Sequence, residues 1–332
     1  MTTDRRRSSI NSNKGEENTL DWDFINQSPS PAAYHCACVI DNAIYIHGGV
    51  FSKGDKNPLN KLQSFDTRTS RWTDLTTAQS PYLSHHSSVV LRDRYFLLIG
   101  GWDGKVRTSD VHSYDTVEKV WKKVPTSGFP EGAGLSSHTS TLLSNDDILI
   151  LGREGGLRMQ RRTGNAYILT GNLNAFKYRV NPMGLSSRSG HTAVIINNNI
   201  VVHGGRDDKA IEEHGGYKKG YKPCSCLKAF VNTEKLSQTK NIPIRRHHSA
   251  IEGCGMMLVF GGEPFSGRSI VEPSGDIFLI TFKPNLTCYK LASSSIARSG
   301  QVLIYTDNDI YIHGGLIPRG GVSSGLFKLK KN

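Results

Sequence analysis

The sequence predicts an all-β fold, a six-bladed β-propeller whose ring is closed by an outer strand from the N-terminus. Three observations support this prediction: a glycine-rich composition, a long internal repeat, and a tryptophan segment near the N-terminus that has no repeat unit of its own. The chain has 332 residues and 34 glycines. Glycine at this level, without a collagen-like period, is typical of an all-β protein with short strands and many tight turns.

Glycine pairs that follow short apolar runs mark the repeat. They are Gly48-Gly49, Gly100-Gly101, Gly204-Gly205, Gly261-Gly262 and Gly314-Gly315, with Gly152-Arg153 as a degenerate sixth. The first residues of successive pairs are 52, 52, 52, 57 and 53 positions apart, so six units account for almost the whole chain. A repeat of this period indicates one supersecondary unit that is stacked several times, as in a solenoid or a propeller.

Each unit reads as four short strands, which we call a, b, c and d. A histidine opens the first apolar run at His35, His86, His138, His191 and His248, and Gln301 takes this place in the sixth unit. The second run leads into the glycine pair, and the third carries an aromatic residue at Phe65, Tyr114, Tyr167, Phe230, Phe278 and Phe327. The fourth carries Trp72 or Trp121 in units one and two, and later units offer the substitutes Tyr178, Leu236 and Tyr289. Turn residues separate the runs, which favours antiparallel strands within each unit.

The sixth unit ends after its third strand, and the missing strand is expected at the other end of the chain. Trp22 precedes Pro31 at the spacing that separates Trp72 from Pro81. Residues 20–26 should therefore supply the outer strand of the last blade and close the ring, which satisfies backbone groups at an otherwise open end. We place the propeller at residues 20–332. The preceding residues 1–19 are polar and basic, and we expect them to be a disordered tail.

This pattern resembles the kelch family, whose repeats of about 50 residues carry a double glycine, a spaced tyrosine and a tryptophan. The resemblance extends from about residue 20 to residue 332. The broken glycine pair at Arg153, the missing tryptophans of units three to five and an insertion at 206–223 depart from the family pattern. The resemblance implies a propeller that binds a protein partner rather than an enzyme.

The charge of the chain directs attention to one face of the predicted disc. The formal net charge is +12. The b-c and d-a loops share a face, and variable loops on a rigid scaffold commonly carry binding residues. Arginine suits carboxylate and phosphate ligands because its planar guanidinium donates two parallel hydrogen bonds. The candidate residues on this face are Arg153, Arg206 and Arg268 in b-c loops, Arg188, Arg245 and Arg298 in d-a loops, and Trp102.

Arg188, Arg245 and Arg298 each stand three residues before the residue that opens the first strand of their unit, which is His191, His248 and Gln301 respectively. They should therefore line one side of the central depression. The resemblance to the kelch family implies that arginines at this position contact acidic peptides. The alternative is that the arginines of this face only solvate loops or pair with nearby carboxylates, such as Glu154, Glu212, Glu213 and Glu263. For Trp102 we weigh an exposed anchor for a partner against packing on a neighbouring loop.

We expect no metal or other cofactor. The six cysteines lack the zinc-site spacing, and without a signal peptide they are expected to be reduced thiols. The repeat histidines are expected to be buried structural groups, and His47, His203 and His313 form a second set in only three units. No apolar run reaches about 18 residues, so no segment is expected to span a membrane. We expect a monomer in the cytoplasm, with the nucleus as a second location.

The predicted function is that of an adaptor or scaffold whose basic loop face binds a protein partner, in particular an acidic or phosphorylated segment. One alternative is substrate recognition for a ubiquitin ligase in trans, because about 19 residues precede the predicted propeller and none follow it. Nucleic-acid binding is a second alternative, for which the basic and aromatic run at 217–222 is the densest support. A propeller enzyme is the third and weakest, because no acid, base or metal constellation is apparent.

Overall fold

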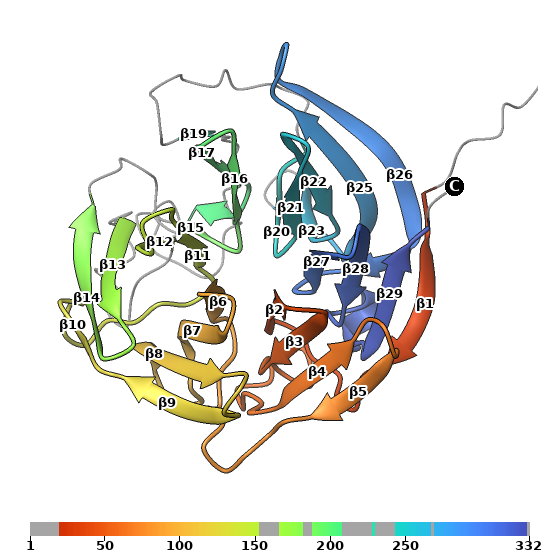
Figure 1. Cartoon of the computed structure of the whole chain (residues 1–332). Helices are drawn as coiled ribbons and strands as arrows, with labels where there is room; N and C mark the ends of the chain where they lie inside the picture. The colour runs from red at the N-terminus through yellow and green to blue at the C-terminus, as the bar shows by residue number, and fades with distance from the viewer. Residues whose placement is uncertain are drawn as a thin grey trace, which may run out of the picture.

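The computed structural model describes residues 20–152, 166–181, 188–207, 228–229, 243–266 and 269–330. Six antiparallel sheets surround a central axis (Figure 1). Their innermost strands contact one another in the cyclic order β2, β6, β11, β16, β21, β27 and back to β2. The all-β six-bladed fold predicted from the repeat is therefore what the structure has.

The blades follow the chain in order. Blade 1 comprises β2 (Cys36–Ile40), β3 (Ala43–His47), β4 (Leu62–Asp66) and β5 (Arg71–Asp74). Blade 2 comprises β6 (Ser87–Leu91), β7 (Tyr95–Trp102), β8 (Arg107–Asp115) and β9 (Val120–Val124). Blade 3 comprises β11 (Thr139–Leu142), β12 (Ile148–Leu151), β13 (Ala166–Asn172) and β14 (Ala175–Asn181), with β10 (Thr126–Ser127) parallel to β14.

The remaining blades are less regular. Blade 4 has β16 (Thr192–Ile196), β17 (Asn199–His203) and β19 (Lys228–Ala229) among its described residues. Blade 5 comprises β21 (Ser249–Gly253), β22 (Met256–Phe260), β25 (Ser274–Thr281) and β26 (Thr287–Arg298), and blade 6 comprises β27 (Val302–Thr306), β28 (Asp309–His313), β29 (Gly325–Leu329) and β1 (Trp22–Gln27).

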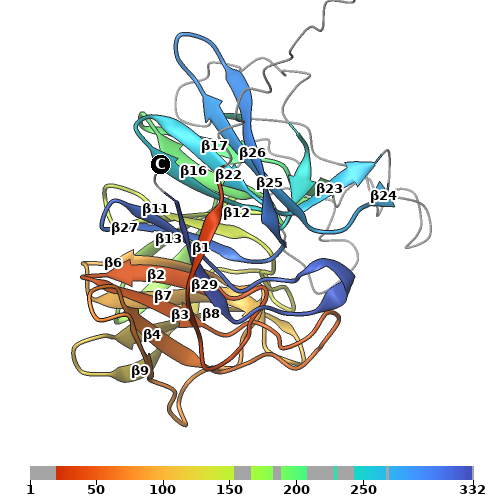
Figure 2. The ribbon, with the colours of Figure 1, turned by 90° about the vertical axis from the view of Figure 1, so that its right-hand side faces the viewer.

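Two small ladders lie beside blades 4 and 5. They are β15 (Arg188–Ser189) with β18 (Arg206–Asp207), and β20 (Arg245–Arg246) with β23 (Glu263–Ser266) and β24 (Ser269–Ile270). Figure 2 shows β23 and β24 projecting on one side of the disc. We call this side the loop face, because it carries the b-c and d-a loops.

The predicted closing strand is β1, which pairs antiparallel with β29 from Trp22↔Leu329 to Gln27↔Gly325. The Trp22 side chain is buried and packs edge-on against Phe260 of blade 5, with ring centroids 5.0 Å apart. Blade 6 is therefore built from strands at both ends of the chain, and its N-terminal strand β1 also contacts blade 5.

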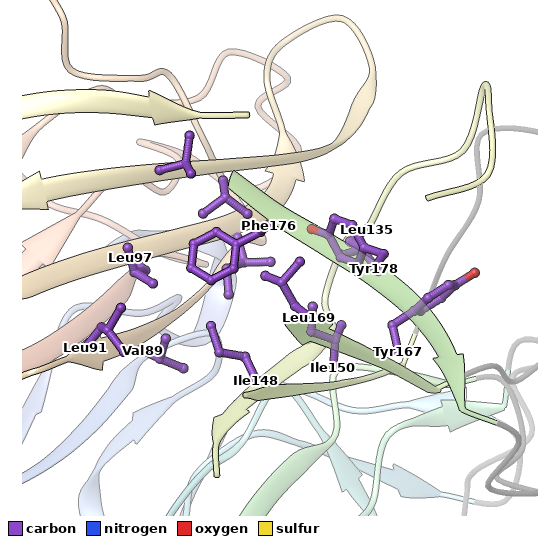
Figure 3. Packing of buried hydrophobic residues seen from close by; sticks show 13 residues of the cluster. Val89, Leu91, Leu97, Leu135, Ile148, Ile150, Tyr167, Leu169, Phe176 and Tyr178 are labelled. Carbon is purple, nitrogen blue, oxygen red and sulfur yellow. The ribbon is translucent and has the colours of Figure 1, made fainter. Parts of the chain in front are cut away.

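The cores lie between adjacent blades as well as within them. The largest cluster combines aliphatic residues of blade 2, such as Leu97, with Ile150 and Leu169 of blade 3, and the aromatic Phe176 and Tyr178 close it (Figure 3). Tyr178 is buried at the position where we expected a tryptophan substitute, whereas Tyr289 at the equivalent place in β26 is half exposed. The third substitute, Leu236, lies outside the described residues, as do the tail at residues 1–19 and Phe230.

The glycine pairs leave room for side chains of two blades. A Cβ at Gly100 would lie 2.7 Å from Leu135 Cβ and 3.1 Å from the ring of His138, both in the next blade. A Cβ at Gly101 would lie 2.7 Å from Cβ of His86 in its own blade. Both glycines also have positive φ, which other residues adopt only with strain.

The repeat histidines are buried and join neighbouring blades, which is the structural role we predicted. In three blades the Nε2 atom lies within hydrogen-bond distance of a Ser or Thr hydroxyl of the preceding blade: His138 and Ser87 at 2.7 Å, His191 and Thr139 at 3.1 Å, His248 and Thr192 at 2.9 Å. Gln301 donates to Ser249 Oγ at 2.8 Å in the same way. At the seam of blades 6 and 1, where Val302 offers no hydroxyl, His35 pairs instead with His313 at 3.0 Å.

No helix among the described residues is long and apolar enough to cross a membrane.

Candidate binding face around the central channel

A closed ring of backbone hydrogen bonds lies at the axis of the propeller. In each blade the residue before the repeat histidine, or before Gln301 in blade 6, has a φ between 51° and 68°, and its N–H donates to the equivalent carbonyl of the preceding blade at 2.8–3.0 Å. The six ring residues are Tyr34, His85, Ser137, Gly190, His247 and Gly300. Because every ring N–H and C=O is paired, the backbone here is fixed, and function depends on the side chains it presents.

Three aromatic side chains contact one another at this ring. Tyr34 stacks on His85 with ring centroids 4.2 Å apart and meets His247 edge-on at 5.0 Å. Glycine is needed opposite them, because a Cβ at Gly190 would lie 2.5 Å from the His247 ring and one at Gly300 would lie 2.7 Å from the Tyr34 ring. A cavity of about 140 Å³ remains among the ring residues and the repeat histidines. Tyr34, His85 and His247 were not among the predicted site residues.

Next to the ring, short backbone ladders surround the mouth of the channel, one in each of five blades. On one side they pair Ala33 with Val50, Ser84 with Trp102, and Ser299 with Leu316. On the other side they pair Ser189 with Arg206, and Arg246 with Glu263. The mouth is therefore mainly apolar beside blades 6, 1 and 2 and charged beside blades 4 and 5.

Glu263 is a buried carboxylate in this charged half. Its Oε2 lies 2.6 Å from Arg246 Nε and 3.8 Å from His247 Nδ1, and its Oε1 accepts a hydrogen bond from Ser299 at 3.4 Å. Burial acts to raise the pKa of Glu263, but the neighbouring His247 and Arg246 outweigh it and lower the pKa to about 2. The side chain is thus ionised and already neutralised, so it orders the rim rather than attracting a cationic ligand.

Two of the predicted binding arginines are buried. Arg188 and Arg245 have almost no exposed surface, and each donates through Nη1 to the carbonyl of the first glycine of its blade's pair, Gly204 and Gly261 respectively. Arg245 also lies 3.6 Å from Asp276 and over the ring of Phe278 at 4.5 Å. The expectation that they line the central depression is therefore wrong in placement, because their guanidinium groups are used inside the protein.

Arg298, the third member, is partly buried. It donates to its neighbour Ala297 O at 2.8 Å and to Ser323 Oγ at 3.3 Å, and burial lowers its pKa to about 10. The equivalent residues of blades 1 to 3 are buried and apolar, namely Ala32, Leu83 and Leu135. Apolar residues at the equivalent position of three other units therefore indicated, already in the sequence, that this position is buried. The neighbouring positions, such as Arg246, are the ones that form the rim.

The other predicted residues divide between the rim and parts outside the described residues. Arg206 lies at the rim as expected and is half-buried. Trp102 also lies at the rim, where its indole N–H donates to Lys56 O of the neighbouring loop at 2.8 Å, so it packs on that loop and keeps part of its surface exposed. Arg153 and Arg268 lie outside the described residues, as do the basic run at 217–222 and Glu154, Glu212 and Glu213.

Outside the rim, the b-c loops of blades 5, 6, 1 and 2 form a continuous arc. Arg319 N donates to Glu272 at 3.2 Å, the Lys53 side chain approaches Gly320, and Lys56 accepts from Trp102. Phe51 is 57% exposed and Val106 is 59% exposed on this arc, and Tyr82 is similarly exposed in the d-a loop between blades 1 and 2. Exposed apolar side chains grouped among polar loops are typical of a protein-binding surface.

Metal binding has no support among the described residues, where no group of three His, Cys, Asp or Glu side chains could hold an ion. His47, His203 and His313 are buried in separate blades. Each pairs with or packs against the repeat histidine of the next blade.

The fold and its repeat define the class of the protein: it is a six-bladed β-propeller whose repeat is similar to that of kelch proteins. The protein-family model described as the KLHDC2/KLHL20/DRC7 Kelch-repeats domain matches residues 10–153 of the chain. The chain superposes on the solved structure of YjhT with a TM-score of 0.72, over 92% of this chain and 99% of YjhT at 13% identity, which shows a shared fold.

Among individual proteins, the chain is similar to Kelch domain-containing protein 9. The Mus musculus protein is 27% identical over 314 residues, which cover 88% of this chain and 89% of that protein. The Homo sapiens protein is 28% identical over the same shares. The resemblance to the kelch family that the repeat indicated is thus confirmed.

Proposed function

We propose that the protein is a non-enzymatic interaction module whose loop face binds an acidic segment of a partner protein. The observation that carries this proposal is the state of the charges on the arc of b-c loops. Lys53, Lys56 and Lys105 are exposed and pair with no carboxylate in the part of the chain that the structure describes. These ammonium groups are available to a partner.

The acidic side chains of the same loops have local partners. Asp55 accepts from Asn57 N at 2.9 Å, and Asp103 accepts from the backbone of Lys105 and Val106 at 2.7 Å each. These carboxylates hold turns in shape, so their capacity for a cationic partner is reduced. A surface with available cations and occupied carboxylates favours an acidic ligand and increases its association rate.

The apolar side chains add a second requirement. Phe51, Tyr82 and Val106 would stay in water unless a partner covers them, and apolar contacts at the centre of an interface commonly supply most of its binding energy. The preferred ligand is thus an acidic segment that also carries apolar residues. Nucleic acid is less favoured, because exposed cations alternate here with apolar groups rather than forming a continuous phosphate track.

The test uses affinity purification of the full chain with two charge-reversed variants. The first variant carries Lys53→Glu, Lys56→Glu and Lys105→Glu on the loop face. The matched control carries Arg68→Glu, Arg71→Glu and Lys119→Glu, which are exposed residues of c-d turns on the opposite face. Both variants change the net charge equally, so a difference between them reports the location of the charge.

We expect specific proteins that the wild type and the control recover equally and the loop-face variant loses. Recovery that is equal in all three proteins would contradict binding at the loop face. Recovery that is lost equally in both variants would instead show dependence on overall charge. If the protein recognises substrates for a ubiquitin ligase in trans, ligase subunits should be among the proteins that the loop-face variant fails to recover.

A further inference from the structure

A groove lies between blades 2 and 3, away from the loop face. Its volume is about 470 Å³, and its walls come from β7, β8 and β9 of blade 2 and from the β13–β14 turn of blade 3. In Figure 1 these elements are neighbours at the outer part of the disc. A groove of this size holds a few residues of a peptide or one small molecule.

The floor of the groove is part of the rigid core between the two blades. Tyr95 and Leu173 line the groove and pack against the aliphatic and aromatic cluster that joins blades 2 and 3. Lys122 crosses the groove and donates from Nζ to Leu173 O at 2.8 Å. The two walls are therefore held at a fixed separation, and a ligand would find the groove already formed.

The charges that line the groove are unbalanced in favour of cations. Asp115, the lining carboxylate, is neutralised by two hydrogen bonds from Arg94, at 2.8 and 2.6 Å, which hold its pKa below the ordinary value. Arg92 is mostly exposed and has only a distant contact with Asp146 at 3.8 Å. Lys122 contacts a neutral carbonyl, so the two cations among the lining residues outnumber the one carboxylate.

An apolar rim lies beside these cations. Val120 at the start of β9 lines the groove and is 55% exposed, and Val117 in the turn before β9 is 65% exposed. Burial of these side chains by a partner would remove apolar surface from water and so favour binding. The groove therefore combines two cations, amide side chains at Asn172 and Asn174, and an aliphatic edge.

We infer that this groove is a second docking site, which binds an acidic protein segment carrying an aliphatic residue next to its carboxylates. Two cations are enough for one or two carboxylates, whereas a nucleic acid needs a longer row of phosphate contacts. The aliphatic edge and the open form of the groove suit an extended segment of a protein. The site is separate from the loop face, so one chain could hold two partners at once, as a scaffold requires.

The experiment is a selection from a random library of 12-residue peptides displayed on phage, carried out against the full chain. Selected peptides are then measured on two groove variants, Arg92→Glu with Lys122→Glu and the single change Val120→Glu. The loop-face variant with Lys53, Lys56 and Lys105 changed to Glu is the control. Circular dichroism and the thermal midpoint establish that each variant is folded, and Val120→Glu serves if the double variant is unstable.

We expect a class of peptides with Asp or Glu beside Leu, Ile or Val whose affinity falls at least about tenfold in the groove variants and less than about twofold in the loop-face variant; tenfold corresponds to about 1.4 kcal/mol. Selection of no peptide that depends on the groove residues would overturn the inference, and so would groove-dependent peptides that are basic or uncharged. Peptides that depend only on the loop face would overturn it as well, while supporting the proposed function.

Discussion

The buried position of Arg245 makes a quantitative prediction that separates structure from binding. An Arg245→Ala substitution removes the hydrogen bond to Gly261 O, the ion pair with Asp276 at 3.6 Å and the stacking on Phe278 at 4.5 Å. Loss of one partner from a buried pair costs about 3–5 kcal/mol. Asp276 keeps Lys290 at 2.9 Å, so we expect the lower value, about 3 kcal/mol.

The assay is unfolding by urea and by heat, followed by circular dichroism. At about 2 °C for each kcal/mol in a chain of this size, the thermal midpoint should fall by about 6 °C. The control is Arg319→Ala, an exposed arginine of the loop arc, which should change the free energy of unfolding by less than about 0.5 kcal/mol. If Arg245→Ala were as stable as Arg319→Ala, the buried guanidinium would contribute nothing, and the structural role argued for it would be refuted.

Three further predictions follow from the repeat. Gly48→Ala places a Cβ 2.3 Å from Leu83 O, whereas Gly54→Ala meets no atom within 4 Å at a similar φ. Urea unfolding should therefore show Gly48→Ala to be less stable than Gly54→Ala by about 1–3 kcal/mol, the cost of overpacking. Equal stability of the two variants would contradict this. Trp22→Ala should lower the free energy of unfolding by about 3–5 kcal/mol, and Phe24→Ala should lower it by much less, because the Phe24 side chain is 60% exposed. The reverse order would contradict the conclusion that β1 closes the ring by burying Trp22. Burial lowers the pKa of His138 to about 3, so the unfolded chain binds protons that the folded chain does not, and stability falls as the pH decreases from about 6.5 toward 3. His138→Gln, which copies Gln301, should reduce the dependence of unfolding free energy on pH in this range by up to about 1.4 kcal/mol per unit, and an unchanged dependence would refute it.

The architecture could be predicted from the sequence because its causes are local and repeated. Each glycine pair must accommodate the histidine of the next blade, so the pair and the histidine recur together. The closing strand was also predictable, since Trp22 and Pro31 keep the spacing of a blade that lacks its outer strand. What the sequence did not predict is how far the aromatic residues of the fourth strands are buried, since Tyr178 in β14 is buried whereas Tyr289 in β26 is half exposed.

The candidate site was predicted less well, because it depends on which way each side chain points. A shift of one residue exchanges the buried Arg245 for the rim residue Arg246, and the charge pattern alone does not distinguish them. The apolar residues Leu83 and Leu135 at the equivalent position did carry that information. The groove between blades 2 and 3 left no local pattern, since its shape depends on the distance between two turns from different blades.

Because Arg188 and Arg245 are buried, arginine substitutions at these positions are unsuitable for a test of binding. A protein with Arg188, Arg245 and Arg298 all changed to Ala would lose internal hydrogen bonds, so a loss of partners would report unfolding rather than contact. Surface lysines avoid this difficulty, because their substitution leaves the packed interior intact.

The most direct test of the central claim is the quantitative recovery of partner proteins by four folded forms: the wild type, the loop-face variant, the groove variant with Arg92→Glu and Lys122→Glu, and the c-d turn control. We expect one set of proteins that is lost only with the loop-face variant. If every partner remained bound to the loop-face variant at the level of the wild type, the claim that this face binds partner proteins would be contradicted.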